Sequence, residues 1–186
     1  MPLEIETTKQ RAPGKQLRLF SVYTDSFAAA NERWAVSQIK TLTGESDLRH
    51  CGRWDLDILL VSEHMKKTAA KAAAGADVLL LSIGSLELRE TSLIYWLDFV
   101  AGAGPDGNAP RLIIGLLGSE KAKATELDWN VKQLIRCAKA MNSAFIWHWM
   151  GEDTSADGDF LTEHIAELLT AKQASLPVLT DSLMSP

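Results

Sequence analysis

The stretch Asp77-Val78-Leu79-Leu80-Leu81-Ser82-Ile83 decides the fold of this 186-residue chain. It is apolar at successive positions, so both faces of a strand formed here would be apolar. That pattern is typical of a parallel strand buried between two layers of helices. The stretch Arg111-Leu112-Ile113-Ile114-Gly115-Leu116-Leu117 has the same character. Two such strands predict an α/β protein whose sheet is covered by helices on both faces.

Strand-like and helix-like segments alternate around these two strands. Three more strands are predicted, over residues 17–23, 48–54 and 144–147. Apolar residues at helical spacing predict helices over 27–43, 62–74, 90–101, 127–141 and 160–171. In the first of these, the inward stripe is expected to hold Ala28, Ala35, Ile39 and Leu42. Right-handed crossovers then give a three-layer α/β/α sandwich, with a five-stranded parallel sheet in the flavodoxin-like order 2-1-3-4-5.

The length fits one domain with two tails. We expect the domain to span residues 17–171, between a flexible arm over 1–16 and a tail over 172–186. The arm has no apolar segment like that of a signal peptide, and no stretch reaches the roughly 18 apolar residues of a membrane span. The sequence therefore predicts a cytoplasmic protein that does not enter a membrane.

Composition excludes several classes of protein. With 46% hydrophobic and 23% charged residues, the chain is typical of a globular protein and not of a disordered one. Its net charge of −5 argues against a nucleic-acid binder, although it leaves room for a local basic patch. Cys51 and Cys137 form no Cys-x-x-Cys pair and are expected to be reduced thiols. No His, Cys, Asp or Glu cluster has metal-ligand spacing, so no metal is expected.

Ligands of such sheets bind outside the carboxyl ends of the strands, which directs attention to four loops. The candidate binding residues in these loops are Thr24, Ser26, Ser82, Gly84, Ser85, Gly118, Ser119, His148 and Trp149. Alternation places Trp147 and Trp149 on one face of the last strand and His148 on the other.

Each loop has a structural interpretation as well. Thr24, Ser26 and the N–H groups of the following helix would suit an anion, but Asp25 puts a carboxylate where a phosphate would sit. The alternative is that Asp25 or Ser26 only caps the helix. The Ser82–Ser85 loop is equally typical of a tight turn, and Ser119 of a helix cap. Trp147 and Trp149 would stack on a planar ring or cover the end of the core.

The segment Leu93-Ile94-Tyr95-Trp96-Leu97-Asp98-Phe99-Val100, with the preceding Ala76-Asp77-Val78-Leu79-Leu80-Leu81, resembles the NAD(P)H-dependent FMN reductases. The shared positions are Leu93, Leu97, Asp98 and the aromatic Phe99. This resemblance implies a flavodoxin-like fold with FMN as a cofactor. The chain departs from the family at Ile94-Tyr95, at the Ser82–Ser85 loop, and after the first strand, where only Thr24 and Ser26 remain of the phosphate loop.

At the level of fold the chain also resembles response-regulator receiver domains. That family carries an acidic pair after its first strand, a phosphorylated Asp at the end of the third and a Lys after the fifth. Here Asp25 matches one acid, but Ser82 and Gly84 stand at the third position and His148 replaces the Lys. Phosphorylation by that mechanism is therefore not expected.

Three hypotheses follow for the function. The first is a non-catalytic interaction or regulatory module that contacts a partner protein or a second copy of itself, with Trp34, Tyr95 or Trp129 as contact residues. The alternative is an FMN-dependent NAD(P)H oxidoreductase that uses the loop residues named above. The third is a hydrolase or transferase with Ser82 or Ser119 and His148, for which no local motif exists.

Overall fold

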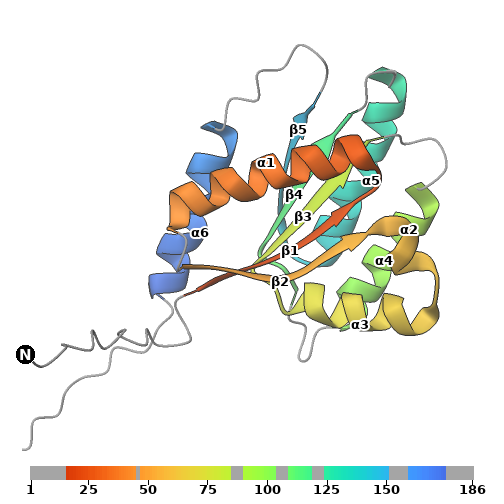
Figure 1. Ribbon diagram of the computed structural model, residues 1–186, viewed down its shortest axis with the longest axis horizontal. Coiled ribbons are helices and arrows are strands. Elements are labelled where there is room, and N and C mark those ends of the chain that lie inside the picture. Colours follow the sequence, from red (N-terminus) through yellow and green to blue (C-terminus); the bar gives the residue numbers. More distant parts are fainter. Residues whose placement is uncertain are drawn as a thin grey trace, which may run out of the picture.

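The computed structural model describes residues 16–44, 47–84, 90–103, 109–118, 124–150 and 159–174. Five strands in this part of the chain form one sheet in the order β2-β1-β3-β4-β5. Every neighbouring pair is parallel, which confirms the predicted flavodoxin-like order (Figure 1). The strands are β1 (Leu17–Tyr23), β2 (Leu48–Asp55), β3 (Val78–Ile83), β4 (Leu112–Leu117) and β5 (Ala144–Trp149).

The helices are α1 (Ser26–Thr43), α2 (Leu56–Leu60), α3 (Glu63–Ala74), α4 (Glu90–Ala103), α5 (Ala124–Ala140) and α6 (Asp159–Ala174). The short α2 was not predicted. The last helix continues beyond the expected Ala171. The domain limits themselves stay a prediction, because residues 1–15 and 175–186 lie outside the described part of the chain.

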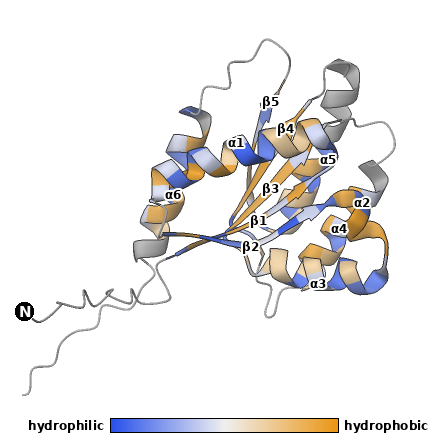
Figure 2. Ribbon diagram, in the orientation of Figure 1, coloured by the Kyte–Doolittle hydropathy of each residue, from blue (hydrophilic) through white to orange (hydrophobic). Residues whose placement is uncertain are grey.

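Two hydrophobic clusters show the three layers. One face of the sheet packs against α2, α3, α4 and α5, and the other packs against α1 and α6 (Figure 1). Within β1, Leu17 and Leu19 point to the α1 side, whereas Phe20 and Val22 point to the opposite side. Figure 2 shows that the central strands β3 and β4 are apolar, while the edge strand β2 is more polar. The two-sided apolar pattern therefore belongs to the buried centre of the sheet, as expected.

Side-chain caps define where three helices begin. The carboxylate of Asp25 accepts the Ala28 N–H at 2.8 Å and caps α1. Ser62 and Asp55 cap α3 and α2 in the same way. Such caps satisfy N–H groups that have no partner within the helix, and each contributes about 1 kcal/mol. Of the two caps predicted for α1, Asp25 is therefore the correct one.

Two expectations about helix packing have different outcomes. Ala28, Ala35 and Ile39 are buried along α1 as predicted, but Leu42 is 38% exposed, so its place in the stripe was wrong. Trp96 of α4 is fully buried, stacks near the Phe20 ring and donates its indole N–H to the Lys66 carbonyl at 3.2 Å. This tryptophan ties α4 to α3 and to the sheet.

The pairing of β2 with β1 contains a bulge. Leu19 pairs with His50, and the next residue, Phe20, pairs with Gly52, so Cys51 has no partner on β1. Gly52 is required at this point, because a Cβ there would lie 2.5 Å from the Phe20 ring. The extra residue changes which face each later side chain of β2 meets.

Candidate functional site

The carboxyl ends of β1 and β3 bring together three of the predicted site residues, namely Thr24, Ser82 and Gly84. The Gly84 N–H donates to the Thr24 hydroxyl at 2.8 Å. The Ser82 hydroxyl donates to the Ala28 carbonyl of α1, also at 2.8 Å. Thr24 and Ser82 are 3% and 1% exposed. Their hydroxyl groups thus join the two strand ends to α1 and are covered by protein.

Asp25 occupies the space that a phosphate would need. A Cβ built on Gly84 would lie 2.7 Å from the Asp25 Cγ, so this carboxylate packs directly against the Gly84 backbone. The same carboxylate accepts the Ala28 N–H at the start of α1. An FMN phosphate at this helix start would meet a negative charge and an occupied space. The described part of the predicted phosphate loop therefore does not fit FMN.

The remaining predicted site residues lie elsewhere or outside the described residues. Ser26 is exposed in the first turn of α1. Ser85 and Ser119 lie outside the described part of the chain. Trp149 lies beside Gly118, whose φ of +138° is a conformation that favours glycine.

His148 and Trp149 stand at the edge strand β5. Two strands, β3 and β4, separate them from β1, which corresponds to about 14 Å at ordinary strand spacing. His148 pairs with Leu116 and therefore faces the α6 side, whereas Trp147 and Trp149 face the α5 side. This confirms the predicted alternation, and burial lowers the pKa of His148. In the described residues, the sheet keeps His148 apart from Thr24 and Ser82.

A second polar site, between α1 and β2, was not predicted. The Ser21 hydroxyl of β1 donates to the Glu32 carboxylate at 2.7 Å and lies 2.9 Å from Nε2 of His50. Arg53 Nε donates to the other oxygen of Glu32 at 2.9 Å. Ser21 is fully buried and Glu32 is 1% exposed. Four polar side chains from three elements thus form one continuous network.

The bulge in β2 makes this network. His50 and Arg53 are three residues apart, so a regular strand would send them to opposite faces of the sheet. Because the pairing skips Cys51, His50 lies opposite Leu19 and Arg53 opposite Ser21, which both face α1. The guanidinium of Arg53 also lies 4.5 Å from the centre of the Tyr23 ring. Arg53 is therefore held between a carboxylate and an aromatic face.

The order of bonds in the network excludes a catalytic triad. In a triad the serine is the exposed end and histidine lies between serine and acid. Here Ser21 lies in the middle and is buried. Because its only proton goes to Glu32, His50 must donate from Nε2 to the Ser21 oxygen. Burial lowers the pKa of His50, although Glu32 opposes that shift. The network holds Arg53 in position and offers no nucleophile.

One signal in the sequence marks this site. Glu32 lies four residues after Ala28 and seven before Ile39, within the apolar stripe of α1. A charged residue at a core position requires a partner, because an isolated buried charge is costly. Gly52 in the strand is a second signal, since a glycine inside a strand often marks a bulge.

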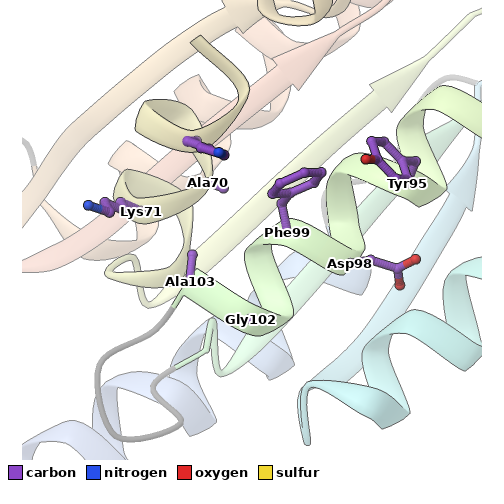
Figure 3. A pocket seen from close by; sticks show the side chains of 8 residues that line it. Ala70, Lys71, Tyr95, Asp98, Phe99, Gly102 and Ala103 are labelled. Atoms are coloured by element: carbon purple, nitrogen blue, oxygen red, sulfur yellow. The ribbon is translucent and has the colours of Figure 1, made fainter. Parts of the chain in front are cut away.

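A groove between α3 and α4 is the third feature. It has a volume of about 450 Å³ and is lined by aromatic, alanine and charged side chains. Tyr95 is 52% exposed and contacts Phe99 edge-on, with ring centres 5.0 Å apart. Figure 3 shows Phe99 between the two helices, with Lys71 and Asp98 on opposite flanks. Of the contact residues predicted from the sequence, Tyr95 lies here, Trp34 packs against the α1 side of the core, and the Trp129 side chain lies outside the described residues.

Two absences concern only the residues that the structure describes. They contain no group of three His, Cys, Asp or Glu side chains placed to hold a metal ion. They also contain no helix long and apolar enough to cross a membrane. Cys51 and Cys137 are free cysteines, of which Cys137 is buried.

Comparison with known proteins supports the fold. No protein-family model and no curated protein matches the chain. An oxidoreductase from Corynebacterium diphtheriae superposes with a TM-score of 0.53 at 9% identity, over 86% of this chain and 96% of the other. This chain has the flavodoxin-like fold, as the strand order and that superposition show.

Two other solved structures align less closely. An NAD(P)H:quinone oxidoreductase from Methanothermobacter marburgensis has a TM-score of 0.47 at 10% identity, with 85% of this chain and 98% of the other covered. An NADH:FMN oxidoreductase in its apo form has a TM-score of 0.47 at 16% identity, with 88% and 91% covered.

Proposed function

We propose that this chain is a non-catalytic module of flavodoxin-like fold that works through protein–protein contacts, either with a partner protein or with a second copy of itself. The observation that carries the proposal is the position of Asp25, whose carboxylate caps α1 and packs against Gly84 where a flavin phosphate would bind. Thr24 and Ser82 bond to the chain itself and are buried. The alternative is an FMN-dependent oxidoreductase. The proposal includes a cytoplasmic location, which rests on the sequence features given above.

The binding surface in this proposal is the α3–α4 groove, and its occupant is a second copy of the chain. Tyr95 supplies exposed aromatic area, which is enriched in interfaces. Lys71 on one flank and Asp98 on the other carry opposite charges (Figure 3). A two-fold axis through the groove would place Lys71 of each copy against Asp98 of its partner. The Lys71 and Asp98 pair is thus complementary to itself, although Lys67 adds a further cation to the lining.

An FMN titration separates the proposal from the alternative. The purified protein should be colourless, and adding it to FMN should leave the flavin fluorescence unchanged. Saturable quenching at micromolar protein would contradict the proposal and support the oxidoreductase.

Charge reversal tests the surface. Lys71→Glu sets two carboxylates against each other at both contacts of the dimer, and Asp98→Lys sets two ammonium groups against each other. Each variant alone should therefore be monomeric in analytical ultracentrifugation. An equimolar mixture should restore a dimer through one contact that joins the two reversed charges and one that keeps the wild-type pair. Lys139→Glu, an exposed change in α5 outside the groove, is the control and should dimerise like the wild type. A wild-type monomer at all concentrations, or no rescue on mixing, would rule out the second copy as occupant.

A further inference from the structure

The structure assigns a phosphate-binding pocket to the space between α1 and β2, for a small ligand that carries a phosphoryl group. The cavity has a volume of about 390 Å³, within the range of small-molecule sites. Arg33 and Lys40 of α1 and Arg53 of β2 line it, together with Glu32 and His50. The site is separate from the α3–α4 groove, since α1 and α3 cover opposite faces of the sheet (Figure 1).

The charges in the pocket match a dianion. Three cationic side chains stand against one carboxylate, and Glu32 is already paired with Arg53 at 2.9 Å. Arg33 and Lys40 therefore supply the positive charge that Glu32 does not offset. A phosphate monoester carries close to two negative charges at neutral pH, which balances that excess. This excess of positive charge is local, because the whole chain has a net charge of −5.

The geometry of α1 places three polar side chains along one face of the helix. Arg33 and Ser37 are four residues apart, and Ser37 and Lys40 are three apart, so the three side chains follow one face of the helix. All three line the cavity. Ser37 stands between the two cations in the order of residues along this face, and its hydroxyl would donate to a phosphate oxygen. Helix periodicity thus places two charges and one hydroxyl on a single wall.

Arg53 forms the opposite wall and is held in advance. Its Nε donates to Glu32 and its guanidinium lies over the Tyr23 ring. Of its five N–H donors, the one on Nε holds the group in place, and the other four are left for an anion. An arginine ordered before binding loses less side-chain entropy when it contacts an anion. Stability alone does not explain a buried Glu32, because an apolar residue of similar size commonly stabilises a core as well as a buried ion pair does. A role in holding Arg53 ready for an anion does explain it.

The test uses the full chain and follows His50 by NMR. The chain has only four histidines, and the loss of one imidazole signal in His50→Gln assigns the one that reports on the pocket. Inorganic phosphate and glycerol phosphate are titrated at constant ionic strength, against sodium chloride. We expect a saturable shift of the His50 signal with both phosphates and none with chloride. Tighter binding of glycerol phosphate would identify an organic phosphate as the ligand, and tighter binding of the inorganic ion would identify free phosphate.

Arg33→Gln and Lys40→Gln should each weaken phosphate binding about 2- to 5-fold, as expected for partly exposed charge pairs. Both positions are exposed, so the fold should not depend on them. Arg136→Gln and Lys139→Gln are the matched controls, exposed on α5, and should leave the affinity unchanged. The proposal is overturned if neither phosphate shifts the His50 signal, or if the control variants weaken binding as much as the pocket variants.

Discussion

The carboxyl end of β1 and the pocket between α1 and β2 both hold polar side chains, but they use them differently. At the strand end, Thr24, Asp25 and Ser82 bond to α1 or to the Gly84 backbone, and the carboxylate fills the available space. In the pocket, Glu32 is satisfied internally while Arg33 and Lys40 line an open cavity. In the described residues, the ends of β1 and β3 are therefore filled by the chain's own side chains, whereas the pocket between α1 and β2 is open.

The largest effect on stability is expected for Arg53→Ala in the polar pocket. It leaves Glu32 buried at 1% exposure without its cation, so we expect the free energy of unfolding to fall by about 3 kcal/mol. Urea denaturation measures the loss. Adding Glu32→Met to Arg53→Ala should regain most of it, because an apolar side chain needs no cation. Arg136→Ala, an exposed control, should change stability little. An equal loss in both arginine variants would show that the buried network does not stabilise the fold.

The fold was predictable because its signal is repeated along the chain. The apolar segments that became β3 and β4 predicted buried parallel strands, and the alternating helices fixed the layers. The five residues of α2 were missed, because so short a helix carries no periodicity. At the strand end, Asp25 was recognised both as a cap and as an obstacle to phosphate.

The polar pocket could not be predicted from the sequence, for a physical reason. His50 and Arg53 share a face only because the pairing of β2 skips Cys51, and a regular strand would separate them. Glu32 could have been noticed in the α1 stripe, but its partners depend on that bulge. Contacts made by an irregular strand cannot be derived from regular alternation.

A second test concerns the closed strand end. Gly84→Ala forces a methyl group against the Asp25 carboxylate and should cost about 2 kcal/mol of stability. Gly84 does not have a positive φ, so the cost is steric and not conformational. Asp25→Ser removes the obstacle and keeps a good helix cap. The alanine should therefore cost much less in the Asp25→Ser background, as urea denaturation of the four variants would measure. An equal cost in both backgrounds would show that the two residues do not touch.

The smallest expected effect is a change in how the stability of the protein depends on pH when His50 is replaced. Burial lowers the pKa of His50, so the folded state favours the neutral imidazole. The unfolded state then binds more protons as the pH falls below 6.5, and stability present above that pH is lost. Glu32 raises this pKa, whereas Arg53 and Lys40 lower it. His50→Gln should lose less stability than wild type in thermal melts between about pH 7 and 5. Part of the loss should remain, because burial also lowers the pKa of His148. If His50→Gln and the wild type had identical pH profiles, the pKa of His50 would not be lowered in the folded state.

The unpaired Cys51 gives β2 two phases of alternation within one strand. Before it, even-numbered residues such as Leu48 and His50 face α1, and after it the odd-numbered Arg53 does. If Cys51 instead paired regularly with Phe20, Arg53 would turn toward the apolar side and Trp54 toward α1, whereas deletion of Cys51 would leave both on their present faces. The edge strand should therefore accept many side chains at position 51, because that residue has no partner on β1. The register of β2 after the bulge, more than the identity of residue 51, keeps Arg53 against Glu32.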